Sequence, residues 1–398
     1  MIVGLFLGNF MPEAGGGFTF VEGVFEAFLG AASRTEHEFI VYCNSECANT
    51  LKCSVLPKNV RIVALRPRSW FEKGIAALKH FAPFFGYFWR RLSPLERRAL
   101  SDDIKLMWFV GGIYDTLDMP YIATVWDVQH LTHPWFPEVS SAWEWEYREY
   151  FNSRYLRRAT YVITGTEVGK LELENFYRLP SKRVRIIPHP TPSFIMRPAD
   201  ISLAEIRARF GLSRNYMFYP AQFWAHKNHV NLLFALRLLV DRDEDAPDLV
   251  FVGSDKGNLQ HVRSEVEALN LTNRVHFLGF VSRAELIGLY QGALALVYAS
   301  FSGPENLPPL EAFGLKCPVL ASDFPGAREQ LGNSALFFDP SCPETIARAM
   351  KLVMTDEHLR RELVERGFTR ASEWSESDYV SEIFSVLDEF DNVRRCWP

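Results

Sequence analysis

Short apolar runs alternate with longer amphipathic stretches along most of the chain. Short runs predict buried strands, whereas apolar positions spaced three or four apart, as in residues 18–32, predict helices that bury one face. In the first half, strands are predicted over residues 2–6, 38–43, 60–65, 105–110, 121–130, 160–164 and 184–188. Since helical stretches separate these strands, the pattern indicates a doubly wound α/β sheet.

The same alternation returns in the second half of the chain. Strands are predicted over residues 216–219, 249–254, 275–281, 293–297 and 319–321, and helices over 283–292, 343–354, 357–371 and 377–390. Between the halves, Pro190, Pro192 and Pro198 interrupt the periodicity, and we place a hinge between them and Gly211. We therefore expect one domain over residues 1–200, a second over 201–376, and a terminal helix in 377–398.

The composition of the chain excludes some classes of function. The 398 residues are 48% hydrophobic, enough for two cores, and the net charge of −5 argues against a nucleic-acid-binding protein, which needs a strongly basic domain. No apolar run approaches the length of a membrane span, and residues 1–8 lack the basic region that begins a signal peptide. We expect a cytoplasmic protein.

Residues 66–98 are unusual because eight Lys or Arg, against two Glu, are interleaved with aromatic residues. This pattern suits an interfacial helix on an anionic membrane surface. We favour the alternative of a core helix with a solvated face, since Pro83 interrupts any long amphipathic helix. Cys43, Cys47 and Cys53 lie close together, but no second cluster with zinc spacing accompanies them, so we expect ordinary thiols and no metal site.

The most informative stretch is residues 301–340. Pro308 and Pro309 open a helix directly after a buried strand, and a helix start at this place offers N–H groups and a positive dipole end to a phosphate. Glu311, in the first turn, adds a carboxylate suited to a ribose diol. A second strand-to-helix turn at residues 322–329 is expected to converge on the same edge.

The order of these signals resembles the donor-binding core of glycosyltransferase family 4, the retaining nucleotide-sugar transferases with the GT-B fold. Family members read Glu-Gly-Phe-Gly-Leu-Pro-x-x-Glu where this chain reads residues 303–311. Glu311 matches the second glutamate, but Gly303 stands at the first, and Glu305 follows two residues later. The resemblance implies a ribose on Glu311, a pyrophosphate near the N–H groups around Leu307, and sugar hydroxyls on Glu305 or Asn306.

Other donor-side positions follow from the same resemblance. The family's glycine loop is matched by Gly16 and Gly17, which would lie against the donor phosphates and sugar. Lys227 matches a lysine that reaches the pyrophosphate, whereas Gln222 replaces the family's arginine and leaves His226 as the nearest alternative cation. The chain near Phe280 is expected to meet the base.

On the acceptor side, the run from Tyr121 ends in a loop that we expect to present Asp127 and His130 as catalytic candidates. Trp126 stands where family members carry a histidine, and His130 or His133 could supply an imidazole from the same loop. The alternative is that a lone histidine in a loop is simply exposed, which is the commoner case.

The resemblance thus implies two Rossmann-like domains facing a cleft, with the last helix crossing back to the first domain. The expected activity is retaining transfer of a sugar, mannosyl or rhamnosyl as a guess, from a nucleotide sugar to a glycan or lipid-linked acceptor in surface polysaccharide or lipopolysaccharide assembly, without a cofactor or metal. Two other readings stay open: a catalytically silent nucleotide-sugar-binding subunit, and a sugar-nucleotide epimerase or phosphorylase. The substitutions at Trp126, Gln222 and Gly303 suggest a variant subgroup.

Overall fold

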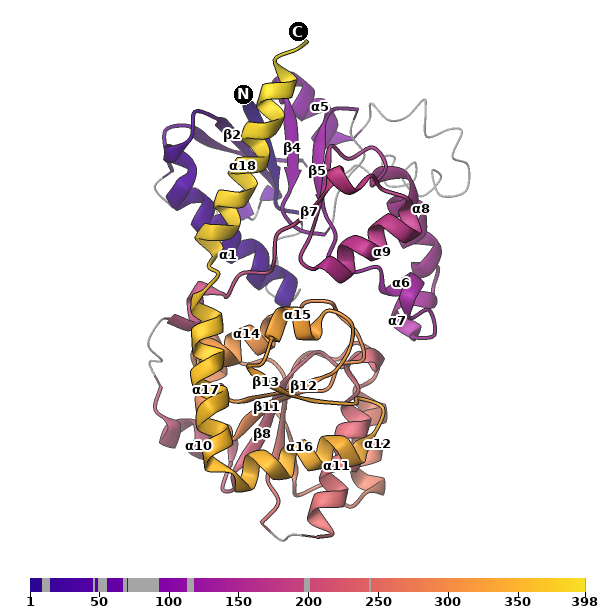
Figure 1. The fold of residues 1–398 in the computed structure, drawn as a ribbon, viewed down its shortest axis with the longest axis vertical. Helices are drawn as coiled ribbons and strands as arrows, with labels where there is room; N and C mark the ends of the chain where they lie inside the picture. The colour runs from indigo at the N-terminus through magenta and orange to yellow at the C-terminus, as the bar shows by residue number, and fades with distance from the viewer. Residues whose placement is uncertain are drawn as a thin grey trace. The chain divides into compact units, whose positions relative to one another are not determined.

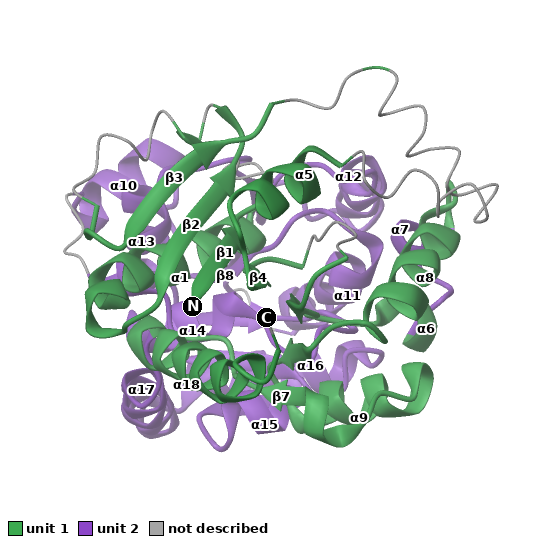
Figure 2. Cartoon of the chain, turned by 90° about the horizontal axis from the view of Figure 1, so that it is seen from above, with its two compact units in different colours: residues 1–132, 141–190, 376–398 green, residues 133–140, 191–375 purple. Residues whose placement is uncertain are grey.

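The computed structural model describes residues 1–8, 15–45, 47–48, 56–66, 70, 93–112, 118–196, 201–242 and 245–397. They form two compact units, coloured in Figure 2. Unit 1 comprises residues 1–132, 141–190 and 376–398, and unit 2 comprises residues 133–140 and 191–375. The chain thus leaves unit 1 at Pro190, ten residues before the expected boundary, and the segment 133–140 belongs to unit 2.

Unit 1 is built on one parallel sheet. In the described residues its seven strands follow the order β3-β2-β1-β4-β5-β6-β7. The strands are β1 (Ile2–Phe6), β2 (Glu38–Cys43), β3 (Val60–Ala64), β4 (Leu106–Phe109), β5 (Tyr121–Thr124), β6 (Tyr161–Thr164) and β7 (Val184–Ile186). Its helices are α1 (Gly16–Ala31), η2 (Ala32–Arg34), α5 (Pro94–Ser101), α6 (Gln129–Thr132), α8 (Glu144–Tyr155), α9 (Glu167–Tyr177), η4 (Ser181–Arg183) and α18 (Glu376–Arg394).

Unit 2 holds a second parallel sheet, whose six described strands follow the order β10-β9-β8-β11-β12-β13. The strands are β8 (Tyr216–Pro220), β9 (Asp248–Val252), β10 (Val275–Phe277), β11 (Ala295–Tyr298), β12 (Val319–Ser322) and β13 (Ala335–Phe338). Its helices are α7 (Pro137–Ser140), η5 (Ser193–Met196), α10 (Leu203–Phe210), η6 (Ala225–Lys227), α11 (His229–Val240), α12 (Leu259–Ala268), α13 (Arg283–Gly292), α14 (Leu307–Gly314), α15 (Ala327–Leu331), α16 (Pro343–Thr355) and α17 (Glu357–Ser372).

Both sheets have the doubly wound topology that the alternating pattern predicts. Their central strands are buried along their whole length, as parallel strands covered on both faces must be. In each unit the strand order reverses beside the first strand, between β1 and β4 in unit 1 and between β8 and β11 in unit 2. Such a reversal opens a crevice at the carboxyl ends of the strands, where ligands of α/β proteins bind.

The last helix, α18, belongs to unit 1 and packs along α1 (Figure 1). The close approach depends on Gly23 of α1, because a Cβ there would lie 1.8 Å from Oε1 of Glu376. Glu376 is buried at the first turn of α18. Gly30, on the same helix, is exposed and has open space around it.

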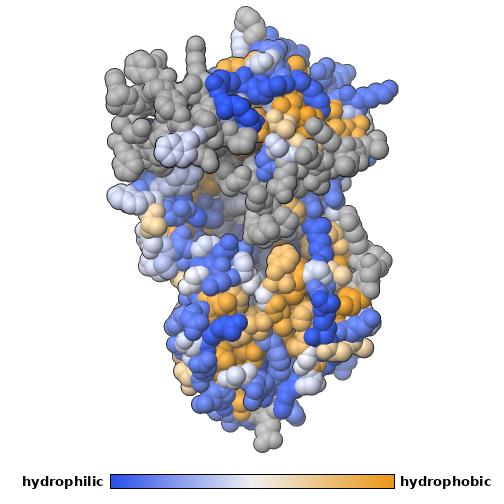
Figure 3. Space-filling model, turned by 180° about the vertical axis from the view of Figure 1, so that it is seen from behind, coloured by the Kyte–Doolittle hydropathy of each residue, from blue (hydrophilic) through white to orange (hydrophobic). Residues whose placement is uncertain are grey.

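No helix in the described part of the chain is long and apolar enough to cross a membrane. Most of the basic and aromatic segment 66–98 lies outside the described residues, and α5 is its described end. On the face drawn in Figure 3, hydrophobic residues are interspersed with hydrophilic ones. Cys43 and Cys47 are buried and form no disulfide, and Cys53 lies outside the described residues.

The two glycines of α1 give a matched test of the α1–α18 contact. We expect Gly23→Ala to destabilise the protein by about 1–3 kcal/mol, because the new methyl group overpacks against Glu376. Gly30→Ala should instead stabilise it by about 0.5–1 kcal/mol through helix propensity alone. Urea unfolding of both variants checks this, and equal effects of the two substitutions would contradict the packing.

Candidate functional site

In unit 2 the candidate residues gather at the carboxyl ends of β8 and β11, where the strand order reverses. Lys227 lies in η6, which follows β8. Tyr298 is the last residue of β11, and the loop that follows it leads into α14. The fold therefore places a cation, a phenol and a helix start at the position where doubly wound sheets bind ligands.

Glu311 lies in the second turn of α14, because the helix begins at Leu307, so the expectation of a first-turn position was wrong; it is only 6% exposed. Tyr290, from α13, donates a 2.7 Å hydrogen bond from its hydroxyl to Oε2 of Glu311. Burial raises the pKa of Glu311 to about 7, although the Tyr290 hydrogen bond and the charge of Arg283 act in the opposite direction. A ligand that donates hydrogen bonds to this carboxylate would stabilise its ionised form.

Lys227 begins a chain of hydrogen bonds that reaches the loop before α14. Its Nζ donates to the hydroxyl of Tyr298 over 2.9 Å, and this hydroxyl donates to Oδ1 of Asn306 over 2.5 Å. Asn306 Nδ2 in turn donates to the backbone carbonyl of Gly303 over 2.7 Å. Because a lysine ammonium has three N–H bonds, two remain for an anion.

The two strand-to-helix turns meet as expected. Asn306 N donates to Oε1 of Gln330 over 3.0 Å, and Gln330 Nε2 donates to the carbonyl of Asn306 over 2.9 Å. Gly326 has a φ of 93°, and a Cβ there would lie 2.8 Å from the carbonyl oxygen of Pro304. The turn at residues 322–329 therefore packs directly on the loop that contains half-buried Glu305.

The start of α14 offers fewer N–H groups than its position in the sequence suggests. Leu307 is its first residue, but Pro308 and Pro309, which follow, have no N–H to donate. The N–H of Asn306 is already bound to Gln330. Any phosphate at this helix start therefore depends on Leu307 N–H and, more strongly, on the nearby charge of Lys227.

Gln222, which replaces the arginine of the resemblance, is held by uncharged partners. Its Nε2 donates to Ser254 Oγ over 3.2 Å, and Trp224 Nε1 donates to its Oε1 over 3.1 Å. The Lys256 ammonium lies 5.8 Å from the centroid of the Trp224 indole ring, at the same sheet edge. This corner of the site thus combines a neutral amide, an indole and one further cation.

His226, the alternative cation, is committed to another contact. Its ring Nδ1 and its backbone N both bond to Oε1 of Glu138, the backbone bond over 2.9 Å. Burial acts to raise the pKa of Glu138, but the hydrogen bonds from His226 outweigh it and hold that pKa below its usual value. A protonated His226 would therefore have its charge balanced by Glu138, so it is a poor substitute for the missing arginine.

Phe280 follows β10 and is 76% exposed, which is unusual for so large an apolar side chain. The preceding Gly279 has a φ of 68°, and its carbonyl accepts a 2.9 Å hydrogen bond from Gly253 N. The exposed ring is thus carried on a loop tied to the end of β9. An aromatic ring in this setting suits stacking on a nucleotide base.

In unit 1, Trp126 fills the space in front of the glycine loop. A Cβ at Gly17 would lie 3.2 Å from its indole, and one at Gly112 would lie 3.3 Å from it. Its ring also packs edge-on against Phe20 of α1, with centroids 5.7 Å apart. Gly17 therefore contacts protein at the place where the resemblance expects a donor, and Gly16 is simply the first residue of α1.

His130 does not face a ligand. It is fully buried, its Nε2 lies 3.1 Å from the hydroxyl of Tyr177, and burial lowers its pKa. The expectation that its loop presents it to a substrate was wrong, because residues 129–132 turn into the short helix α6 and carry the ring inward. Asp127 is half-exposed, accepts from Gln129 N over 2.9 Å and lies 3.5 Å from Nη1 of Arg148. His133 belongs to unit 2 and packs against Trp135.

The structure thus links Lys227, Asn306 and Gly303 by hydrogen bonds at the carboxyl ends of β8 and β11, and it places Glu311 in the helix that follows, α14. Tyr290, Tyr298 and Gln330 contact these residues, and sequence reasoning missed them. Tyr298 had a signal, because it directly follows the strand predicted over residues 293–297 and ends β11 in the structure. Tyr290 and Gln330 contact the site because their helices pack beside it. The spacing of residues along the sequence does not reveal such packing. The described residues contain no group of His, Cys, Asp or Glu side chains that could hold a metal ion.

Known proteins resemble this chain in sequence and in fold. Residues 204–370, all within unit 2, match the family model of the glycosyl transferases group 1. The structure of Anabaena Alr3699/HepE in complex with UDP and glucose is similar over 98% of this chain and 100% of that one, with a TM-score of 0.71 and 14% identity. The fold is GT-B.

Two relatives are O-antigen chain mannosyltransferases. RfbU of Salmonella typhimurium is 27% identical over 198 residues, which are 49% of this chain and 51% of RfbU. O-antigen chain mannosyltransferase B of Escherichia coli is 24% identical over 221 residues, which are 55% of this chain and 58% of that protein. The chain thus spans about half the length of these relatives.

The burial of Glu311 predicts a pH-dependent stability. Its pKa is raised in the folded protein to about 7, above the usual 4.5, so the stability from this group is full below about pH 4.5 and is lost as the pH rises through 7. At pH 8, Glu311→Gln should therefore be more stable than the wild type by about 1–2 kcal/mol, because the charge penalty exceeds the cost of an unpaired amide.

Denaturant unfolding at pH 5 and pH 8 checks this prediction. The gain at pH 8 should disappear at pH 5, where the folded wild type already holds the proton. Glu267→Gln, at an exposed position on α12, is the control and should change stability little at either pH. A Glu311→Gln variant that is less stable than the wild type at both pH values would contradict the prediction.

Proposed function

We propose that this protein is a glycosyltransferase that moves a sugar from a nucleotide-sugar donor to a glycan or lipid-linked acceptor, in the assembly of surface polysaccharide or lipopolysaccharide. One observation carries the proposal: Lys227, at the carboxyl end of β8, is linked through Tyr298 to the loop before α14, and the second turn of that helix holds the buried carboxylate of Glu311. A nucleoside diphosphate needs both, a cation for its phosphates and an acceptor for its ribose hydroxyls. The O-antigen mannosyltransferases among the relatives favour mannose as the sugar.

Each donor group has a proposed partner. The ribose diol donates to Glu311, the pyrophosphate lies on Lys227 and Leu307 N–H, and the base stacks on Phe280. The sugar hydroxyls meet the loop that contains Glu305 and Asn306. As the sugar leaves, Lys227 stabilises the negative charge that grows on the departing phosphate.

The finer assignment to a variant subgroup of family 4, with retention of configuration, rests on the motif at residues 303–311. The resemblance favours front-face attack in which the departing phosphate takes the acceptor's proton, and among the described residues of unit 2 no carboxylate is an evident covalent nucleophile. Asp127 is the proposed acceptor-side residue of unit 1. The proposal needs no metal, because Lys227 supplies the positive charge. Membrane contact through residues 66–98 and a cytoplasmic location stay predictions.

A second candidate is a catalytically silent nucleotide-sugar-binding subunit. The specific observation that favours it is Trp126, whose indole occupies the space before Gly17 and Gly112 where the resemblance expects a histidine. Gln222 is the second neutral replacement. Donor turnover in the presence of a glycan acceptor separates the two candidates, and product formed without any acceptor would indicate an epimerase instead.

The raised pKa of Glu311 predicts a pH-dependent affinity for the donor. A ribose diol donates to the ionised carboxylate, so the donor binds the deprotonated form and releases a proton. With a pKa of about 7 in the free protein, affinity should rise about tenfold from pH 6 to pH 8. Titration calorimetry with UDP-, GDP-, ADP- and dTDP-sugars measures it, and the diesterified phosphates of these ligands do not themselves titrate in this range.

Glu311→Gln provides the matched control. It keeps an oxygen that accepts from Tyr290, but it should bind the sugar nucleotide more weakly and equally at both pH values. Glu311→Ala should abolish turnover while the protein stays folded. Equal wild-type affinity at pH 6 and pH 8, or near-normal turnover by Glu311→Ala, would overturn the assignment of the ribose site.

The exposed ring of Phe280 gives an independent test of the base site. Phe280→Ala should leave stability nearly unchanged and weaken nucleotide-sugar binding about tenfold, because stacking on a base is worth about 1–3 kcal/mol. Phe234→Ala removes an exposed phenylalanine on α11 and should leave affinity unchanged. The base site is misplaced if the two variants bind alike.

A further inference from the structure

Tyr298 occupies a position that the proposed function does not by itself explain. Tyr298 is the last residue of β11 and is only 3% exposed. Its hydroxyl lies between two polar side chains that come from different loops. Lys227 Nζ lies 2.9 Å from the Tyr298 hydroxyl and 5.3 Å from the ring centroid. On the other side, the same hydroxyl lies 2.5 Å from Oδ1 of Asn306.

We propose that Tyr298 is a positioning residue that couples the Lys227 cation to the loop Gly303–Asn306, so that the phosphate site and the sugar-facing loop respond to the donor together. That the ligand is a nucleotide-sugar donor rests on the proposed function. The coupling itself is a property of the free protein and can be measured without a ligand.

The donors and acceptors fix the direction of every hydrogen bond in the series from Lys227 to Gly303. An ammonium only donates, so the Tyr298 oxygen accepts from Lys227 and its own proton points to Asn306 Oδ1. This orients the Asn306 amide with Nδ2 toward the carbonyl of Gly303. The positive charge at the head of the chain polarises the phenol and strengthens the bond to Asn306.

Gly303 makes this arrangement possible. Its φ is 118°, and a Cβ at this position would lie 2.9 Å from Oδ1 and 3.1 Å from Nδ2 of Asn306. The amide of Asn306 therefore lies where a side chain at position 303 would begin. Since the backbone N–H and carbonyl of Asn306 are both bound to Gln330, the loop is held by the cation chain on one side and by α15 on the other.

A bound diphosphate would draw the Lys227 ammonium toward its oxygens and so change the bond that Tyr298 accepts. The next bonds in the chain end in the loop that contains Glu305. Occupancy of the phosphate site is thereby transmitted to the sugar side over three hydrogen bonds. Without the Tyr298 hydroxyl, the lysine and the loop should behave independently.

Hydrogen exchange of the loop amides tests the coupling in the full chain without a ligand. In Tyr298→Phe and in Lys227→Met, exchange over residues 303–306 should rise about fivefold, and the double variant should rise no further than either single variant. Tyr216→Phe is the control, because it removes another buried phenol, which donates to the Leu289 carbonyl over 2.8 Å. It should leave loop exchange unchanged.

Loop exchange that stays at the wild-type rate in Tyr298→Phe, or two single effects that add in the double variant, would overturn the proposal. A general loss of stability does not imitate it, since Tyr216→Phe removes a comparable buried hydrogen bond of the same domain.

A second measurement separates this inference from the proposed function. With the sugar nucleotide that the wild type binds, Tyr298→Phe should lose about tenfold in affinity, whereas Tyr216→Phe should bind normally. A wild type that binds no sugar nucleotide but shows the predicted exchange pattern would refute the proposed function and support the coupling. A wild type that binds, with Tyr298→Phe equal to Tyr216→Phe in both measurements, would refute the coupling alone.

Discussion

The reversal of strand order between β8 and β11 is the constraint on which the candidate site depends. Successive helices leave the parallel sheet on opposite faces at that point, so the loops after the two strands separate and expose their carboxyl ends. Lys227 comes from the first of these loops, and the Gly303–Asn306 loop from the second. Tyr298, at the end of β11, contacts both.

The two charged groups of the candidate site, the Lys227 ammonium and the Glu311 carboxyl, lie in different electrostatic environments. The Lys227 ammonium is available to an anion, whereas the Glu311 carboxyl is buried deeply enough that its charge is costly until hydrogen-bond donors surround it. Gln222 and the Glu138-bound His226 add no unbalanced charge on the lysine side. The described cations of this edge are therefore Lys227 and, beside the Trp224 indole, Lys256.

Much of this arrangement could be predicted from the sequence. The alternation of apolar runs and amphipathic stretches was enough to identify two doubly wound sheets, and the prolines at 308 and 309 were enough to predict a helix start after a buried strand, which β11 and α14 form. Local patterns failed where tertiary packing decided the outcome. His130 was placed in a loop but lies in a short helix that buries it, and Gly17 makes room for an indole. Tyr290 and Gln330 come from helices whose approach to the site no local spacing encodes.

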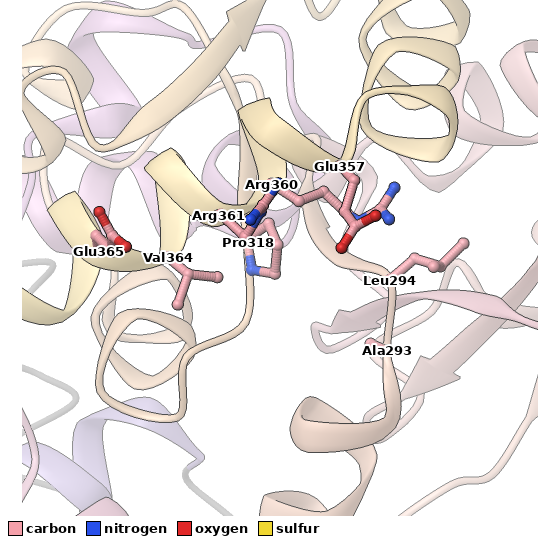
Figure 4. A pocket seen from close by; sticks show the side chains of 8 residues that line it. All are labelled: Ala293, Leu294, Pro318, Glu357, Arg360, Arg361, Val364 and Glu365. Carbon is pink, nitrogen blue, oxygen red and sulfur yellow. The ribbon is translucent and has the colours of Figure 1, made fainter.

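The described surface of unit 2 also holds a cavity of about 370 Å³ at the amino ends of β11 and β12. It is lined by Leu294 and Pro318 and by Glu357, Arg360 and Arg361 of α17 (Figure 4). It lies at the sheet edge opposite to the candidate site. Arg360 is bound to the Val353 and Met354 carbonyls at the end of α16, so it has a structural role, and Arg361 is the other arginine that lines the cavity.

A crystal structure of the protein with the sugar nucleotide that it binds most tightly tests the central claim most directly. We expect the diphosphate within hydrogen-bond distance of Lys227 Nζ and the ribose hydroxyls within hydrogen-bond distance of Glu311. A nucleotide bound in the cavity beside Arg361, or at the carboxyl edge with its ribose away from Glu311, would contradict the account.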